Sequence, residues 1–172
     1  MLRGHRLAFN LLAAVACFAL FGYAMYSQLY QGLQPCPLCI FQRVAVISLG
    51  VAFVLAALVP ARARIVGCIA AVVVGLVALA GAGVAGRHLY VQSQPPGSVP
   101  DCGAPLDYMM DVFPVIDVLR KVLTGSGECS RIDWTFLGLA MPAWVLIWVL
   151  GLGITGVLVN WHSRIDRNSW RS

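Results

Sequence analysis

Four long apolar runs, separated by short polar or basic segments, dominate the hydrophobic pattern of this chain. The runs cover approximately residues 7–27, 40–59, 65–86 and 141–161. Each is close to the length of about 20 residues that a helix needs to cross the hydrocarbon core of a bilayer. The pattern therefore predicts an all-α fold with four membrane-spanning helices, in a single membrane domain over residues 1–172.

The first apolar run also has to be compared with a secretory signal peptide. The apolar core of a signal peptide is about 7–15 residues long, whereas the run from Leu7 to Tyr26 is longer and carries no charge. We therefore expect a retained transmembrane helix at this position.

The composition agrees with a membrane protein. Hydrophobic residues make up 60% of the 172 residues and charged residues only 11%, whereas a soluble domain carries about 25% charged residues. The net charge of +5 comes from basic residues in short segments between the apolar runs. Since these segments form no basic face and contain no interleaved aromatic residues, the charge does not indicate nucleic-acid binding.

The basic residues also predict how the chain crosses the membrane. Seven arginines lie in the head, in the turn between the second and third runs, and in the tail: Arg3, Arg6, Arg62, Arg64, Arg164, Arg167 and Arg171. Lys and Arg are enriched in cytoplasmic segments. We therefore expect both termini in the cytoplasm and two connections, approximately residues 28–39 and 87–140, on the outer, oxidising side.

The longer outer connection contains a pattern typical of a short amphipathic helix. Apolar residues recur at helical spacing between Cys102 and Cys129, and Pro114 interrupts them. We expect this helix to start near Pro114 and to lie on the bilayer surface. Docking of a partner protein is the alternative use of the same apolar stripe.

The sequence Cys36-Pro37-Leu38-Cys39 stands directly before the second apolar run, and Arg43 follows four residues later. In a C-x-x-C motif the thiol pKa can fall well below the ordinary value of about 8.5. If a helix begins near Pro37, then Cys36, Cys39 and Arg43 share one face. The cation would then stabilise a thiolate at Cys39, which indicates redox chemistry.

Two other uses of these cysteines have to be weighed against redox chemistry. The C-x-x-C can form a passive disulfide, or it can build a Cys₄ zinc site together with Cys102 and Cys129. Zinc is disfavoured because structural zinc sites draw on closely spaced ligand pairs, and only one close pair is present. Cys17 and Cys68 lie inside apolar runs, where cysteine behaves as a small hydrophobic residue, and we assign them no role.

Taken together, these motifs resemble the disulfide bond formation protein B (DsbB) family. The resemblance covers roughly residues 7–161 and rests on Cys36-Pro-Leu-Cys-Ile-Phe-Gln-Arg43, on His88, on the Cys102…Cys129 loop, and on the segment from Trp134 to Trp144. It implies a four-helix transmembrane bundle in the bacterial inner membrane that acts as a quinone-dependent protein-dithiol oxidoreductase. The implied partner is a periplasmic DsbA-like oxidase of thioredoxin fold.

The resemblance also implies a catalytic role for four cysteines. The Cys102–Cys129 disulfide would be attacked by the reduced partner, with Cys102 forming the mixed disulfide. The Cys36–Cys39 pair would then reoxidise Cys102–Cys129, through a bridge between Cys36 and Cys129. In this way the electrons would reach the C-x-x-C.

The implied cofactor is membrane quinone, either ubiquinone or menaquinone. By the same resemblance, Cys39 would pass electrons to the quinone and Arg43 would stabilise the thiolate and the reduced quinone oxygen. His88 would form a hydrogen bond with the quinone head group. Gln42 departs from the family pattern, because some members carry an acidic residue there, and this changes the charge around Arg43.

Two alternative functions remain open from the sequence. A vitamin K epoxide reductase-like enzyme also combines a helical bundle with a C-x-x-C, but its motif is expected late in the chain. A non-catalytic membrane scaffold with two structural disulfides is the alternative outside enzymes. Inert disulfides would resist mild reductants, whereas catalytic disulfides would exchange readily with thiols.

Overall fold

The computed structural model describes residues 2–32, 35–59, 64–95, 106–124, 127–130, 132 and 134–162. Its elements are α1 (Leu2–Tyr30), α2 (Pro37–Leu58), α3 (Arg64–Gln92), α4 (Leu106–Val112), α5 (Val115–Thr124), α6 (Gly127–Ser130), β1 (Thr135–Phe136), β2 (Leu139–Ala140) and α7 (Met141–His162). Four of these helices, α1, α2, α3 and α7, are long and apolar enough to cross a membrane. The predicted all-α membrane fold with four spans is therefore confirmed.

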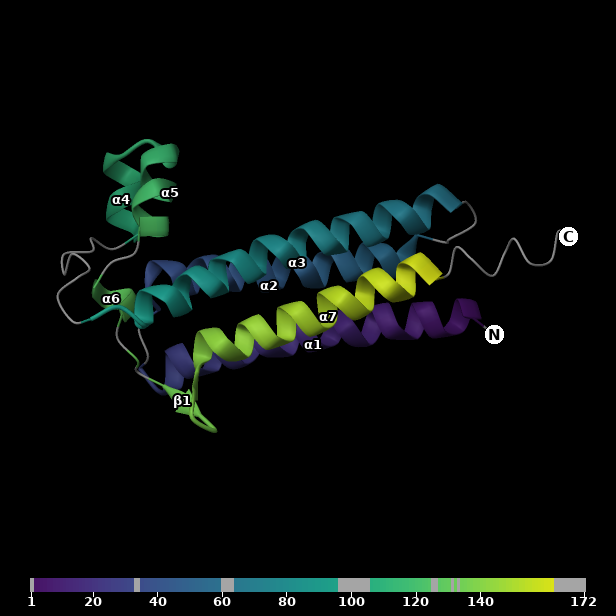
Figure 1. Ribbon diagram of the computed structural model, residues 1–172, viewed down its shortest axis with the longest axis horizontal. Coiled ribbons are helices and arrows are strands. Elements are labelled where there is room, and N and C mark those ends of the chain that lie inside the picture. The colour runs from purple at the N-terminus through teal and green to yellow at the C-terminus, as the bar shows by residue number, and fades with distance from the viewer. Residues whose placement is uncertain are drawn as a thin grey trace, which may run out of the picture.

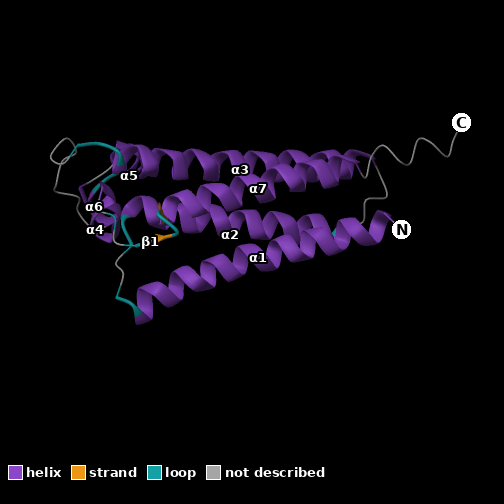
Figure 2. Ribbon diagram, turned by 60° about the horizontal axis from the view of Figure 1, so that its bottom comes forward, coloured by secondary structure: helices purple, strands orange, loops and turns teal. Residues whose placement is uncertain are grey.

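The four long helices form an antiparallel bundle (Figure 1). α1 packs mainly on α2, α2 also packs on α3, and α3 packs on α7. The bundle has a terminal end, where α1 begins and α7 ends around Arg6 and Asn160. It also has a cysteine end, around Cys36 and His88, where α4, α5, α6 and the β-strands gather (Figures 1 and 2).

The long helices extend beyond the predicted apolar runs at the cysteine end. α1 continues to Tyr30 and α3 to Gln92, and α2 begins at Pro37. Backbone hydrogen bonding depends only weakly on side-chain polarity, so the helices continue where the side chains become polar. The connections between α1 and α2 and between α3 and α7 are correspondingly shorter than predicted. As a result, Cys39 and His88 lie within regular helices and not in loops.

The middle of the bundle is held together by a core around Phe53 of α2, which is completely buried. Gly156 of α7 lies directly against this ring. A Cβ atom at Gly156 would stand 2.6 Å from Phe53 Cε1 and 3.0 Å from Val74 Cγ1 of α3. Glycine is therefore what allows α7 to approach both neighbours at this level, since close approach of helices in membranes depends on small residues.

A buried polar cluster, absent from our predictions, joins three helices at the terminal end. Arg6 Nε donates to Asn160 Oδ1 at 2.8 Å, and Arg6 Nη2 donates to the carbonyl oxygen of Ala56 at 3.0 Å. The amides of Asn10 and Asn160 exchange hydrogen bonds of 3.1 and 3.3 Å. Because these groups come from α1, α2 and α7, the cluster fixes the relative position of the three helices.

The amphipathic helix predicted near Pro114 is present as α5, which begins one residue later. Its Val118 and Val122 are buried and pack against Leu38 and Val91, at the ends of α2 and α3. These two valines cover the cysteine end of the bundle, on a different face from the predicted apolar stripe, of which Met110 and Ile116 are exposed. The location of that stripe on the bilayer surface stays a prediction. α5 is thus part of the packing around the C-x-x-C.

A short β-hairpin, which the sequence pattern did not predict, leads into α7. β1 and β2 pair in antiparallel fashion, and the turn between them has Leu137 at φ 51° and Gly138 at φ 78°. Positive φ at both turn residues is typical of two-residue hairpins. The hairpin is fastened to α7, because Trp144 Nε1 donates to the carbonyl oxygen of Phe136 at 3.1 Å.

Candidate functional site

The C-x-x-C motif forms the beginning of α2. Cys36 is the N-cap residue, with an extended backbone at φ −68° and ψ 163°, and Pro37 occupies the first helical turn. Proline suits this position because its missing N–H has no intrahelical partner there in any case. The Cys36 Sγ atom accepts a hydrogen bond from the backbone N–H of Cys39 at 3.3 Å. The helix start itself therefore brings the two cysteines together.

The sulfur atoms of this pair lie 2.8 Å apart. Cys36 is buried, whereas Cys39 is partly exposed. The two sulfur atoms need to approach by less than 1 Å to reach the bond length of about 2.05 Å found in disulfides. The pair is therefore positioned both for thiol chemistry and for closing a disulfide.

Cys129 joins the C-x-x-C from α6, in the connection between α3 and α7. α6 packs on α2 and α3, and Cys129 is buried in one hydrophobic cluster with Cys36. The Cys129 and Cys36 side chains form a hydrogen bond. The pKa of the Cys36 thiol is raised by this bond, then by the bond with Cys39 and by burial, so Cys36 retains its proton at neutral pH.

His88 of α3 lies beneath this group of three sulfur atoms and is only 2% exposed. Its Nε2 atom is 3.7 Å from Cys36 Sγ and 3.2 Å from the carbonyl oxygen of Cys129. On the other side of the ring, Nδ1 is 3.0 Å from Gln42 Nε2. If the Gln42 amide donates to Nδ1, then Nε2 carries the ring proton and donates it to the Cys129 carbonyl oxygen. His88 thus connects α2, α3 and α6.

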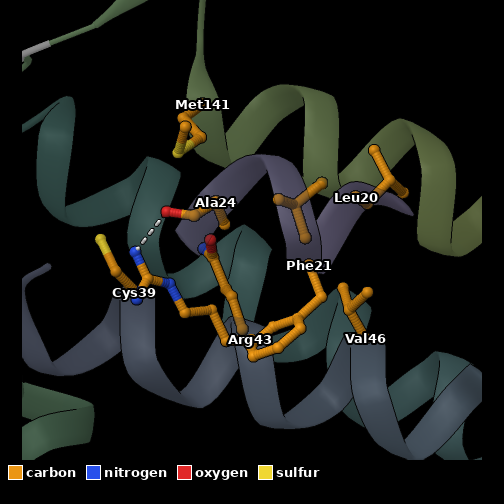
Figure 3. A pocket seen from close by; sticks show the side chains of 9 residues that line it. Leu20, Phe21, Ala24, Cys39, Arg43, Val46 and Met141 are labelled. Carbon is orange, nitrogen blue, oxygen red and sulfur yellow. Dashed lines mark hydrogen bonds between the residues drawn. The ribbon is translucent and has the colours of Figure 1, made fainter. Parts of the chain in front are cut away.

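Arg43 points away from His88, toward α1. Its Nη2 atom donates to the carbonyl oxygen of Ala24 at 3.2 Å. Its Nη1 atom donates to Gln28 Oε1 and also contacts Met25 Sδ at 3.7 Å. Figure 3 shows the guanidinium between the Cys39 side chain and the Ala24 carbonyl group. The cation is therefore held next to Cys39 by groups at the end of α1.

A cavity of about 70 Å³ lies beside Cys39, between α1, α2 and α7 (Figure 3). Its lining residues are Leu20, Phe21 and Ala24 of α1, Cys39, Gln42, Arg43 and Val46 of α2, and Met141 and Val145 of α7. The walls are apolar except for the Cys39 thiol, one amide and one guanidinium. Such a lining suits a small planar molecule that has a few hydrogen-bond acceptors.

The predicted site residues thus fall into two groups around α2. Cys36, Cys129 and His88 meet on the side of α3 and α6, whereas Arg43 stands at the cavity on the side of α1. Cys39 belongs to both groups, because it contacts Cys36 and also lines the cavity. Cys102, the fourth predicted catalytic cysteine, lies outside the described residues. All five cysteines that the structure describes carry thiols.

Two polar residues of the site did not stand out in the sequence. Gln28 holds Arg43, and Gln42 holds His88. In the sequence, Gln42 stands out only as a departure from the family pattern, and nothing marks Gln28. Gln28 follows the first apolar run and Gln42 lies near the start of the second. This position of a polar amide at the edge of a membrane span was the signal available in the sequence.

Comparison with known proteins agrees with this geometry. Residues 5–159 match the family described as Disulfide bond formation protein DsbB. The chain is 46% identical to the Disulfide bond formation protein B of Methylococcus capsulatus over 155 residues, which cover 89% of this chain and 93% of that protein. It is 42% identical to the protein of the same name from Xylella fastidiosa over 147 residues, 86% of this chain and 85% of that protein.

A third relative extends the same similarity. The Disulfide bond formation protein B of Xanthomonas axonopodis pv. citri is 43% identical over 158 residues, which cover 90% of each chain. The matched region includes the C-x-x-C, the first three membrane-length helices and most of the fourth. The chain therefore belongs to the DsbB family of membrane proteins for disulfide bond formation.

Proposed function

We propose that this protein reoxidises a periplasmic, DsbA-like dithiol oxidase and passes the electrons to membrane quinone. The observation that carries the proposal is the position of the Cys36 sulfur, which contacts Cys39 on one side and Cys129 on the other. Three sulfur atoms in sequence are what a relay of disulfide exchange requires. In this proposal the chain is a single domain of the bacterial inner membrane, with both termini in the cytoplasm.

The first exchange takes place on the outer connection. A thiolate of the reduced partner attacks the Cys102–Cys129 disulfide at Cys102, forms a mixed disulfide there and releases Cys129 as a thiolate. Cys129 then attacks Cys36 of the Cys36–Cys39 disulfide, which forms a Cys36–Cys129 bond and releases Cys39 as a thiolate. The hydrogen bond between the Cys129 and Cys36 side chains supports this order.

The second exchange completes the transfer of two electrons. The remaining thiol of the partner attacks the mixed disulfide, so the partner leaves oxidised and Cys102 is released. Cys102 then attacks Cys129 in the Cys36–Cys129 bond, which restores the Cys102–Cys129 disulfide. The net result is one disulfide in the partner and a reduced Cys36–Cys39 pair.

The cavity beside Cys39 is the proposed quinone site. Its apolar walls and its one guanidinium fit a planar ring with carbonyl oxygens, and quinone accepts two electrons and two protons when it is bound. Arg43 would stabilise the Cys39 thiolate, and its guanidinium would hold the ring oxygens of a bound quinone. His88 does not line the cavity, and its bonds to Gln42 and Cys129 favour a role in positioning the cysteines. This differs from the direct hydrogen bond to quinone that the resemblance implies.

The reaction needs an acceptor such as quinone on energetic grounds. DsbA has a reduction potential near −120 mV, whereas ordinary structural disulfides lie below about −300 mV. Oxidation of DsbA by such a disulfide would be uphill by about 8 kcal/mol for two electrons. The relay therefore proceeds only if its disulfides are unusually oxidising or are reoxidised by a stronger acceptor.

The test is anaerobic mixing of the full-length protein in detergent with a reduced DsbA-like oxidase and a soluble quinone analogue. We expect stoichiometric loss of quinone absorbance, which disappears in the Cys39→Ser variant. The Cys17→Ser and Cys68→Ser variants are matched controls and should retain the activity. Absence of quinone loss while the outer cysteines remain oxidised would contradict the proposal and favour a scaffold with structural disulfides.

A further inference from the structure

The cluster of Cys36, Cys39 and His88 has a second chemical property besides thiol exchange. The Sγ atoms of both cysteines and a ring nitrogen of His88 all lie within 4.8 Å of one another. Two thiolates and one imidazole are the ligand types that Zn²⁺ prefers in proteins. We infer that the reduced protein binds one thiophilic divalent cation, such as Zn²⁺, through Cys36 Sγ, Cys39 Sγ and His88 Nε2.

The distances in the cluster are close to those of a tetrahedral zinc site. With bonds of about 2.3 Å to sulfur and 2.0–2.1 Å to nitrogen, two ligand sulfurs stand about 3.8 Å apart, and a sulfur and a nitrogen about 3.5 Å apart. The observed separation between Cys36 Sγ and His88 Nε2 is 3.7 Å. The two sulfurs, now 2.8 Å apart, have to separate by about 1 Å, which a rotation of the partly exposed Cys39 side chain can provide.

The surroundings of His88 supply the support that a metal-binding imidazole needs. Such a ring usually donates its second N–H to a fixed acceptor, which sets the orientation of the ring. Gln42 is in contact with Nδ1 at 3.0 Å. If its amide turns by half a rotation, the Gln42 oxygen accepts a proton from Nδ1, and Nε2 is left with its lone pair toward the sulfur atoms.

The proposed site differs from the Cys₄ arrangement that the sequence suggested as an alternative. Two of its ligands come from the N-cap and first turn of α2, and the third comes from α3. Leu38 and Val91 belong to the same hydrophobic cluster as Cys36. Cys129, which forms a hydrogen bond with Cys36, adds a further soft donor beside the cluster. The site is thus largely built from the rigid bundle and not from the outer connection.

Binding of the cation depends on the redox state of the protein. A Cys36–Cys39 disulfide leaves no thiolate to bind, whereas the reduced pair loses two protons to solvent and bonds to the ion without any change in oxidation state. A bound ion holds the two sulfurs apart as thiolates, so it prevents the disulfide from forming again. Zinc would therefore act as a reversible inhibitor of the reduced protein only.

The inference does not depend on the proposed electron path, because its test needs neither quinone nor the partner. The full-length protein in detergent is reduced with a phosphine, freed of reductant under anaerobic conditions, and dialysed against buffered Zn²⁺. We expect one zinc ion per reduced chain and none per oxidised chain. Replacement by Co²⁺ should give the visible absorption bands of tetrahedral thiolate coordination.

Variants locate the ion within the bundle. Cys39→Ser should abolish stoichiometric binding, and Gln42→Leu should lower the zinc affinity about 10- to 100-fold, as is typical when the partner of a metal-binding histidine is lost. The double variant Cys17→Ser/Cys68→Ser is the matched control and should still bind one ion. Equal binding by the oxidised and reduced forms of the unaltered chain would overturn the inference, as would full binding by Cys39→Ser.

Discussion

Replacement of Gln28 by Leu tests whether the end of α1 positions the cation of the proposed quinone site. Gln28 Oε1 accepts a hydrogen bond from Arg43 Nη1, whereas the carbonyl oxygen of Ala24 accepts from Nη2. Leucine has nearly the same size but offers no acceptor. The substitution therefore frees one side of the guanidinium without removing its charge.

The size of the effect follows from the kind of bond that is lost. A hydrogen bond to a charged group contributes about 1.5–3 kcal/mol. Both side chains are partly exposed, and the bond to Ala24 remains, so the lower limit of about 1.5 kcal/mol applies. Because about 1.4 kcal/mol corresponds to a factor of ten, we expect the apparent KM for a soluble quinone analogue to rise about tenfold.

The kcat should change little in this variant, because the lost interaction contributes to binding of the ground state and the transition state alike. The assay is steady-state quinone reduction with a saturating concentration of the reduced partner. Gln31→Leu is the matched control, since Gln31 lies three residues further along and is exposed. Its KM should be unchanged.

A double-mutant cycle decides between positioning of Arg43 and a separate effect of Gln28. If Gln28 acts through Arg43, then Gln28→Leu should have no further effect in a chain that already carries Arg43→Ala. Additive increases in KM would refute this reasoning, and so would a KM in Gln28→Leu equal to that of the control.

Three further predictions concern the thiols and the packing. Its thiol neighbours and burial raise the pKa of Cys36, and only the thiolate reacts with iodoacetamide. The rate of Cys36 alkylation in the reduced protein, measured by peptide mass spectrometry, should therefore still increase with pH above pH 9. A rate that levels off below pH 9 would contradict this. Gly156→Ala should lower the apparent Tm in detergent, since its Cβ would stand 2.6 Å from Phe53 Cε1 and overpacking costs about 1–3 kcal/mol. Gly83→Ala, with nothing within 4 Å, is its control, and an equal Tm for both variants would remove the steric argument. Asn160→Leu should lower the Tm while quinone reduction continues, because Arg6 and Asn10 lose a buried partner far from the cysteines; an unchanged Tm would show that the polar cluster is not needed for stability.

The features that were predictable from sequence are those that a single segment specifies without contacts to distant residues. An apolar run of sufficient length specifies a membrane helix wherever it occurs, and Pro37 after Cys36 indicates a helix start. Pro114 likewise marks the beginning of α5, because proline is tolerated only near a helix start. These local signals predicted the four spans and placed the C-x-x-C at the start of the second span.

The features that were not predictable depend on residues that are far apart in the chain. Gln42 and His88 are separated by 46 residues, and Arg6 and Asn160 by 154. No periodicity in either segment selects its partner. The hairpin before α7 was missed for a different reason, because strands of two residues are too short to show alternation. Likewise, the apolar stripe of α5 indicates a buried face but not whether lipid or protein covers it.

The position of Cys39 on α2 explains why its two polar neighbours serve different parts of the site. With 3.6 residues per turn, Gln42 lies about 60° from Cys39 around the helix in one direction, and Arg43 lies about 40° in the other. Gln42 therefore reaches α3 and His88, whereas Arg43 reaches the end of α1. Cys39 stands between them, in contact with Cys36 and open to the cavity.

Cys36 occupies a different kind of position, because the N-cap backbone is extended and lies outside the helical path. Its sulfur can therefore contact Cys39 and, at the same time, Cys129 and His88. A cysteine within the helix would be restricted to one direction, set by its position around the axis. The C-x-x-C at a helix start thus combines one sulfur that faces Cys129 of α6 with one that faces the cavity between α1, α2 and α7. This arrangement is what the proposed relay between a soluble dithiol and a lipid-dissolved acceptor requires.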